Sequence, residues 1–306
     1  MSTSLDRDVR TAAPPFWLSP TAYWQPERIV TSAWLGHAPF AFWLMDALRP
    51  RGVVELGTHY GFSCFVFAQA AKRLGSTTAI RALDSWEGDD QAGFYGEEVY
   101  ASVADVAQRE YPELVTLMRG WFSETRTLVA DDSVDLLHID GRHSYDDVSE
   151  DYEQWRSTVR DGGVILFHDI AETENGFGVW RLWEELSTKY PSFAFAHSHG
   201  LGVLSVGEPR SGAIADLFAA DDETAAAIRR DFEELGRRIE RLAWLEAKPA
   251  EVDSLHEVVA MLQGRTADLE HKIAERDREV AEIRSSTSWR VTRPLRSLGT
   301  RLQRRG

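Results

Sequence analysis

Short apolar runs alternate with helix-like apolar patterns through the middle of the chain, and this alternation predicts the fold. Strands are predicted over 52–56, 79–84, 114–118, 133–139 and 162–168, and helices over 61–74, 97–110, 122–130, 145–159 and 176–189. Such alternation is typical of a parallel sheet covered by helices on both faces. The last two apolar runs, 193–197 and 201–206, are joined by a short Ser-His-Gly turn. They predict a hairpin and therefore an antiparallel edge.

The region before this core, residues 1–50, predicts an N-terminal helical cap segment rich in aromatic residues. Core packing is the common reason for such aromatics, and lining of a substrate pocket is the alternative. Residues 29–45 carry no formal charge, but Gly36, His37 and Pro39 interrupt them. They therefore predict buried helices and not a membrane span.

Beyond residue 209 the strand pattern stops, so the core domain is predicted to cover residues 51–209. Residues 213–248 predict a charged helix, and residues 250–284 follow a heptad pattern. Most of the seam positions in that pattern are apolar, which predicts a coiled coil and a homodimer formed through residues 252–283. Residues 285–306 form a basic tail that contains Trp289.

Composition narrows the classes of function. The chain has 306 residues, 43% of them hydrophobic, and a net charge of −15. This charge argues against nucleic-acid binding by the main domain. The single cysteine, Cys64, excludes an internal disulfide and makes a reducing cytoplasm the expected location. The N-terminus has no apolar run of the kind that marks a signal peptide.

The stretch VVELGTHYGFS, residues 53–63, predicts a strand, a glycine-containing turn and a helix start. Glycine lets the backbone approach a ligand, and a helix N-terminus favours polar or anionic groups. The spacing E-x-G-x-x-x-G, set by Glu55, Gly57 and Gly61, differs from the dinucleotide fingerprint G-x-G-x-x-G. The acidic residue suits a cofactor with an ammonium group or hydroxyls. An ordinary strand-to-helix turn is the alternative.

Four motifs together resemble those of class I S-adenosylmethionine-dependent methyltransferases. They are ELGTHYG at 55–61, LDSW at 83–86, LHIDGRH at 137–143 and GGVILFHD at 162–169. The resemblance covers about residues 30–207 and is greatest to the group that includes cephalosporin-pathway, rhamnosyl and macrocin O-methyltransferases. It implies a Rossmann-like seven-stranded methyltransferase sheet with an antiparallel terminal hairpin, to which the coiled coil is appended.

The resemblance also implies where S-adenosylmethionine binds. Asp84 at the end of the second strand is expected to accept hydrogen bonds from the ribose hydroxyls. Trp86 is expected near the adenine, although a core position is the alternative. The cofactor-binding residues predicted in this way are Glu55, Gly57, Thr58, Gly61, Ser63, Asp84, Trp86 and Ser123.

Asp140, His168 and Asp169 end the fourth and fifth strands, which should bring them together at one edge of the sheet. Two carboxylates and an imidazole can hold a divalent cation, and the resemblance implies Mg²⁺. A hydrogen-bonded Asp-His pair without metal is the alternative. His143 is the predicted catalytic base, assisted by Asp140, with a helix cap as its alternative role.

These features predict an O-methyltransferase that acts on a sugar hydroxyl of a glycan or a glycosylated metabolite. The tail sequence STSWRVTRPLR resembles the tails of bacterial surface-polysaccharide glycosyltransferases, which favours glycan modification. The basic tail is therefore expected to contact an anionic membrane surface, at the inner face, or a glycosyltransferase. A small-molecule natural-product methyltransferase and a non-catalytic coiled-coil scaffold are the alternatives. The glycine spacing and the terminal hairpin disfavour an NAD-dependent enzyme.

Overall fold

The computed structural model describes residues 14–89, 93–209 and 212–291. The chain divides into two compact units, residues 1–244 and 245–306. The predictions for residues 1–13 and for most of the basic tail, 292–306, lie outside the described residues.

The first unit is built on a seven-stranded sheet in the order β5-β2-β1-β6-β7-β9-β8. The strands β5, β2, β1, β6 and β7 are parallel, and β9 pairs antiparallel with both β7 and β8. Their bounds are β1 (Gly52–Leu56), β2 (Ala79–Asp84), β5 (Val115–Arg119), β6 (Val134–Ile139), β7 (Val159–His168), β8 (Ser192–Phe195) and β9 (Leu201–Val206). The predicted seven-stranded sheet with an antiparallel terminal hairpin is confirmed. A short second sheet of β3 (Gly88–Asp89) and β4 (Gly93–Phe94) was not predicted.

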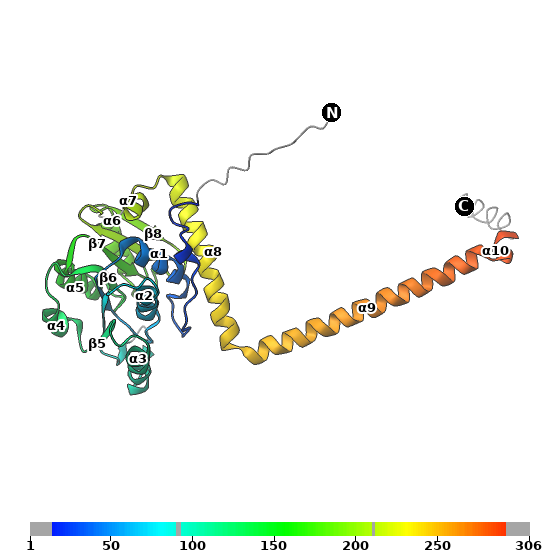
Figure 1. Cartoon of the computed structure of the whole chain (residues 1–306), viewed down its shortest axis with the longest axis horizontal. Helices are drawn as coiled ribbons and strands as arrows, with labels where there is room; N and C mark the ends of the chain where they lie inside the picture. Colours follow the sequence, from blue (N-terminus) through cyan, green and yellow to red (C-terminus); the bar gives the residue numbers. More distant parts are fainter. Residues whose placement is uncertain (1–13, 90–92, 210–211, 292–306) are drawn as a thin grey trace, which may run out of the picture. The chain divides into compact units, whose positions relative to one another are not determined.

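Helices cover both faces of this sheet (Figure 1). One face carries α1 (Ala38–Leu48), α2 (Phe62–Arg73), α3 (Glu97–Glu110), α7 (Gly212–Phe218) and α8 (Asp222–Ala247), and the other carries α5 (Tyr145–Trp155) and α6 (Val179–Ser187). Alternate residues of one strand enter the two cores, because successive side chains of a strand point to opposite faces. Thus Val53 packs with α1 and α2, whereas Val54 packs with the α5 and α6 side. Cys64 is a buried core residue, as predicted.

Several predicted helices end earlier in the structure than their apolar pattern suggested. The helix predicted over 145–159 ends at Trp155, because a 3-10 turn, Arg156–Thr158, leads directly into β7. The helix predicted over 122–130 is α4 (Phe122–Thr125) followed by the 3-10 turn Arg126–Leu128.

The charged helix predicted over 213–248 is two helices, α7 and α8. Asp221 separates them by accepting a hydrogen bond from the Thr224 amide at 2.8 Å, as an N-cap does.

The helix α8 is an integral part of the first unit, because its apolar stripe packs on α1. The Phe232 ring lies 5.4 Å from the Phe40 ring, and both rings are fully buried. Close to this contact, a Cβ atom on Gly236 would lie 2.3 Å from the carbonyl oxygen of Gly36. The predicted aromatic N-terminal segment is thus held between the sheet and a helix from beyond the core domain.

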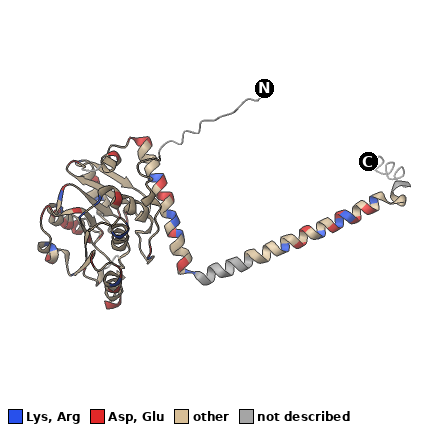
Figure 2. Ribbon diagram, in the orientation of Figure 1, with Lys and Arg blue, Asp and Glu red and all other residues tan. Residues whose placement is uncertain are grey.

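The second unit contains α9 (Pro249–Ser285) and α10 (Thr287–Val291). Acidic and basic residues are interspersed along the described part of α9 (Figure 2). Among the helices that the structure describes, none combines the length and the apolar character needed to cross a membrane.

The contact between α8 and the N-terminal segment should be intolerant of added volume. We expect Gly236→Ala to lower the free energy of unfolding by about 1–3 kcal/mol, because the new methyl group meets backbone that cannot rotate away. Urea unfolding followed by circular dichroism would measure the change. Gly212→Ala is the matched control, since a Cβ there meets nothing within 4 Å. Equal stability of both variants and the wild type would contradict the proposed close packing.

Candidate functional site

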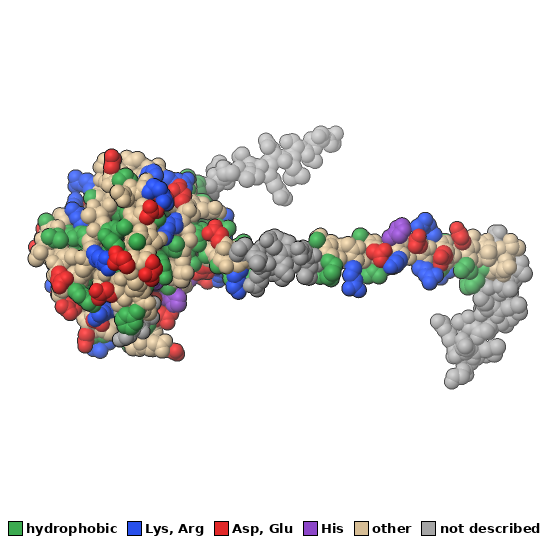
Figure 3. Space-filling model, turned by 90° about the horizontal axis from the view of Figure 1, so that it is seen from below, with side chains coloured by type: hydrophobic (Ala, Val, Ile, Leu, Met, Phe, Trp, Pro, Cys, Tyr) green, Lys and Arg blue, Asp and Glu red, His purple; other side chains and the backbone are tan. Residues whose placement is uncertain are grey.

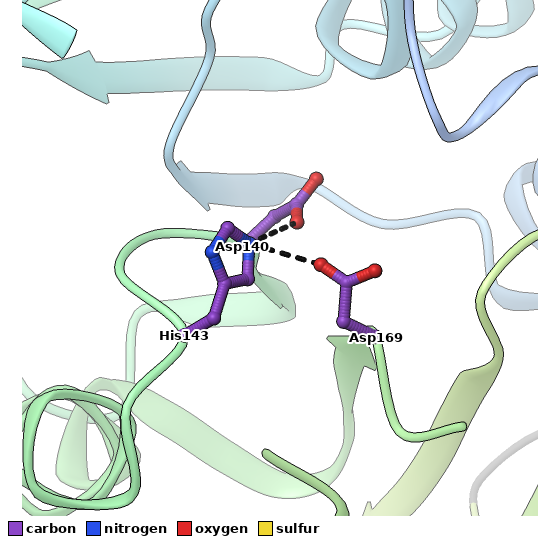
Figure 4. A group of neighbouring side chains, drawn as sticks. All are labelled: Asp140, His143 and Asp169. Atoms are coloured by element: carbon purple, nitrogen blue, oxygen red, sulfur yellow. Dashed lines mark ion pairs between the residues drawn. The ribbon is translucent and has the colours of Figure 1, made fainter. Parts of the chain in front are cut away.

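Acidic residues and histidines gather where the carboxyl ends of β6 and β7 meet. Asp140 directly follows β6, His168 is the last residue of β7, and Asp169 follows it in a left-handed conformation with φ of 61°. His143 reaches the same place from the loop that leaves β6 (Figure 4). The strand pairing predicted from the sequence therefore does bring Asp140, His168 and Asp169 together.

His143 and His168 each lie close to both carboxylates, and Nδ1 of His168 is 3.1 Å from Asp140 and 3.3 Å from Asp169. The ring of His143 approaches through its other nitrogen. Its Nε2 atom lies 2.9 Å from Oδ2 of Asp169 and 3.9 Å from Oδ1 of Asp140. Figure 4 shows the imidazole facing the two carboxylates, which extend from neighbouring strands. One ligand atom from each of Asp140, His143 and Asp169 lies within 4.8 Å of the other two. The group can therefore hold a cation or pass a proton.

His168 belongs to the cluster but does not occupy the ligand position predicted for it. Its Nε2 atom lies 3.1 Å from the carbonyl oxygen of Ser198, and a carbonyl oxygen can only accept. Its Nδ1 atom lies 3.1 Å from Oδ1 of Asp140. When both ring nitrogens donate, as in the protonated imidazole, His168 has no lone pair to offer a metal. The group of possible ligands contains Asp140, His143 and Asp169.

His143 does not cap the helix that follows it. The N-cap of α5 is Ser144, whose side chain accepts a hydrogen bond from the Asp147 amide. The His143 ring instead stacks on Phe177, with ring centroids 4.6 Å apart and planes 18° apart. Its backbone carbonyl accepts a hydrogen bond from the Gly178 amide at 2.7 Å. The loop after β6 and the loop before α6 thus fix the imidazole.

The opposite charges of the carboxylates and the imidazoles determine which groups of the cluster carry protons. Burial alone would lower the pKa of His143, but the hydrogen bonds and charges of Asp140 and Asp169 outweigh it and raise the pKa to about 9. The same opposition raises the pKa of His168 to about 10. Burial would raise the pKa of Asp140, yet the neighbouring imidazoles hold it well below its usual range. At neutral pH, two carboxylates therefore face two imidazolium ions.

The glycine turn after β1 closes tightly over this cluster. Gly57 has a left-handed φ of 92°, and a Cβ atom there would lie 1.9 Å from the carbonyl oxygen of Asp140. Only glycine fits at this position, as the motif predicted. The turn is held by Asp84, whose Oδ2 accepts hydrogen bonds from the Thr58 and His59 amides at 3.0 and 2.8 Å.

Asp84 also holds the chain that follows β2, since its Oδ1 accepts from the Trp86 amide at 2.7 Å. Three of the roughly four acceptor positions of a carboxylate are thus occupied by backbone amides. The side chain still lines the cavity described below. It therefore has room for one hydroxyl donor, and its larger role is to shape the turn.

Three residues predicted to contact the cofactor, Glu55, Gly61 and Trp86, do not line the cavity described below. Glu55 is fully buried, accepts a hydrogen bond from the Ser63 hydroxyl at 2.6 Å and lies 3.1 Å from Nδ1 of His138. Trp86 is also buried, and its indole donates to the His59 carbonyl at 3.0 Å. Glu55 thus supports the turn from below, and Trp86 takes the core position that was its alternative.

A cavity of about 600 Å³ joins the glycine turn to the acidic cluster. This volume falls in the range of small-molecule sites. The predicted site residues that line it are Gly57, Thr58, Ser63, Asp84, Ser123, Asp140, His143, His168 and Asp169. Residues 31–34 of the N-terminal segment form another part of its wall.

A family described as "Methyltransferase domain" matches residues 54–170, which contain the glycine turn, Asp84 and the acidic cluster. The strand order and the antiparallel terminal hairpin agree with that assignment. These residues form a methyltransferase domain of that family.

Similar proteins give little information about the rest of the chain. The uncharacterized protein y4gI of Sinorhizobium fredii is 40% identical over 271 residues, which is 89% of this chain. This chain spans 28% of that protein's length. An O-methyltransferase from Bacillus cereus in complex with SAH is 16% identical, with a TM-score of 0.45 over 59% of this chain and 84% of that one. TomG, an O-methyltransferase from Streptomyces achromogenes involved in tomaymycin synthesis, is 16% identical, with a TM-score of 0.44 over 60% of this chain and 83% of that one. Both structures are too distant to bear on function.

One wall of the methyltransferase cavity was missed by the sequence analysis. Asp147, Asp151 and Gln154 of α5 line the cavity together, next to Arg142. Burial, then the charges of its acidic neighbours, raises the pKa of Asp151 to about 7. Their spacing of four and three residues places polar groups on one face of the helix, and that periodicity was the available signal.

We expect Asp84→Asn to weaken S-adenosylmethionine binding about tenfold or more. The amide would present a donor to backbone amides that now donate to Asp84, at a cost of about 1–3 kcal/mol. Isothermal titration of the methyltransferase would measure the affinity. Asp135→Asn is the matched control, because Asp135 accepts from the Arg51 and Gly52 amides at the other end of β1. The control should lose stability without losing affinity, and equal affinity losses in both variants would contradict a local role for Asp84.

The two imidazolium ions should make stability depend on pH in the alkaline range. Their pKa values are higher in the folded state, so their contribution is complete below about pH 6.5 and is lost as the pH rises through 9 and 10. We expect the unfolding free energy to fall by up to about 1.4 kcal/mol per pH unit for each of the two groups in that window. Thermal unfolding at several pH values, with chelator present, would show it. His168→Asn should flatten the slope, and an unchanged slope would contradict the charge assignment.

Proposed function

We propose that this chain transfers the methyl group of S-adenosylmethionine to a sugar hydroxyl of a glycan or a glycosylated metabolite. The observation that carries the proposal is the position of His143, Asp140 and Asp169 in the cavity that the glycine turn also lines. A proton acceptor thus lies in the same enclosed space as the predicted cofactor site. Methyl transfer to oxygen needs this combination, because the hydroxyl becomes a good nucleophile as it loses its proton.

His143 is the group best placed to take that proton. Its Nε2 atom points at the carboxylates from the cavity wall, and Phe177 fixes the plane of its ring. The raised pKa of about 9 keeps the imidazole protonated at neutral pH while both carboxylates are charged. To act as a base it must be neutral, so something has to offset the charges of Asp140 and Asp169.

A divalent cation fits this requirement. Asp140 and Asp169 come from adjacent strand ends, and paired carboxylate oxygens suit Mg²⁺, which binds one or two carboxylates and keeps several waters. Bound between them, the cation would supply positive charge that offsets both carboxylates. The pKa of His143 would then return toward neutrality, and its Nε2 atom could accept the proton from the acceptor hydroxyl.

The cavity wall near His143 suits a polyhydroxylated acceptor. Glu172, Asn175 and His199 offer hydrogen-bond groups there, and Phe177 offers an aromatic ring. Carboxylate, amide and aromatic groups in one wall can bind several hydroxyls and also pack against the apolar face of a sugar ring. The resemblance of the C-terminal tail to those of polysaccharide glycosyltransferases supports the same class of acceptor.

The proposal is tested by transfer of labelled methyl groups from S-adenosylmethionine to glycans and glycosylated metabolites. We expect His143→Ala to lower kcat about 10²–10⁴-fold with little change in cofactor affinity. His271→Ala is the matched control, because His271 lies exposed on α9 in the second unit. An unchanged kcat in His143→Ala would remove His143 from the mechanism.

Chelation tests the cation separately from the base. Turnover should stop when divalent ions are removed and should return with Mg²⁺, whereas full activity in metal-free protein would contradict the cation. Methylation of phenolic hydroxyls in place of sugars would favour a natural-product acceptor. Tight binding of S-adenosylmethionine without any transfer would favour a non-catalytic scaffold.

A further inference from the structure

An uncovered apolar stripe runs along α9 in the second unit. Its side chains are three, four or seven residues apart, at positions of a heptad repeat, and each is between 42% and 61% exposed. They are Val259, Leu262, Leu269, Ile273, Val280 and Ile283. Figure 3 shows apolar side chains on the surface of this helix, among charged ones. An apolar stripe of this length and period needs a partner helix to cover it.

Thr266 and Arg276 occupy the remaining positions of the stripe. A partner helix could cover each of them. Thr266 donates its hydroxyl to the carbonyl of Leu262 at 3.0 Å, so a partner helix would not leave it unpaired. Arg276 pairs with Glu279 of the same helix at 2.8 Å, which compensates its charge. Both residues cost stability in the seam, but neither prevents pairing.

The charges beside the stripe identify the partner. The seven positions of a heptad are named a to g, and the seam consists of positions a and d. In a parallel, in-register pair of identical helices, position g of one heptad lies beside position e of the next heptad on the other chain. This rule gives three contacts: Arg265 with Glu270, Lys272 with Asp277, and Glu279 with Arg284. All three join opposite charges, and twofold symmetry repeats each of them. We propose that residues 259–283 of two copies of this chain pair as a parallel, in-register, two-stranded coiled coil.

Other arrangements of two copies oppose like charges. A shift of one heptad in either direction places Lys272 beside Arg284, or Glu279 beside Asp277. An antiparallel pair that overlaps along the same stripe places Lys272 beside Lys272 of the second copy. Like charges at these flanking positions disfavour an arrangement, and such repulsion is what commonly fixes orientation and register.

Four of the six flanking charges are available for a second chain, whereas Lys272 and Glu279 would share theirs with Asp268 and Arg276 of their own helix. Within the described part of the chain, Arg265, Glu270, Asp277 and Arg284 make no ion pair. The seam itself favours two strands, because β-branched residues occupy its first heptad positions and leucines occupy two of the four positions between them. The pairing does not depend on the proposed enzymatic activity, since it involves a separate unit of the chain.

Two charge-swapped variants of the full chain test both the partner and the orientation. One carries Arg265→Glu and Lys272→Glu, and the other carries Glu270→Lys and Asp277→Lys. In each variant alone, the attractions at four flanking contacts become repulsions, which should weaken the homodimer about tenfold or more. Mixed in equal amounts, the two variants should regain the wild-type affinity as a heterodimer, because every contact again joins opposite charges.

Sedimentation equilibrium over a range of micromolar concentrations would measure these masses. The matched control carries Asp268→Lys and Glu275→Lys, the same change of charge on the same helix but away from the seam. It should remain dimeric. A monomeric or trimeric wild type, or two variants that each dimerise as tightly as the wild type, would overturn the proposal. So would a mixture that stays monomeric.

Discussion

The compensation of Asp140 and Asp169 by two imidazoles is the interaction on which the methyltransferase site depends. Parallel strands bring both carboxylates to one buried edge, and two negative charges in such a place need positive partners. His168 supplies one charge from the end of β7, and His143 supplies the other from the loop after β6. The carbonyl of Ser198, in the turn between β8 and β9, holds the far side of His168. The terminal hairpin is thereby linked to the chemistry at the strand ends.

The position of the site was predictable from the sequence because it follows from the strand ends alone. Once strands are read from apolar runs, Asp84, Asp140 and Asp169 must lie along one edge of a parallel sheet. The glycine turn was predictable for a similar reason, since Gly57 has no room for a side chain beside Asp140.

The roles of individual side chains were less accessible, because they depend on which face of a strand each residue occupies. Glu55 follows Val53 on the face of β1 that α2 covers, so it meets Ser63 and not the cofactor space. His168 ends β7 and Asp169 follows it with a left-handed φ of 61°, and a strand pattern does not predict that turn. His143 lies in a loop, whose course no periodicity describes. The packing of α8 on the N-terminal segment depends on contacts between residues some two hundred positions apart, which no local pattern reveals.

The cavity wall formed by residues 31–34 lies outside the part of the chain that the methyltransferase family shares. Part of the cavity wall is therefore encoded outside the stretch that carries the glycine turn and the strand ends. A change in residues 31–34 would alter the shape of the cavity without replacing any residue of the matched domain, and it would have to keep the close contact between Gly36 and Gly236.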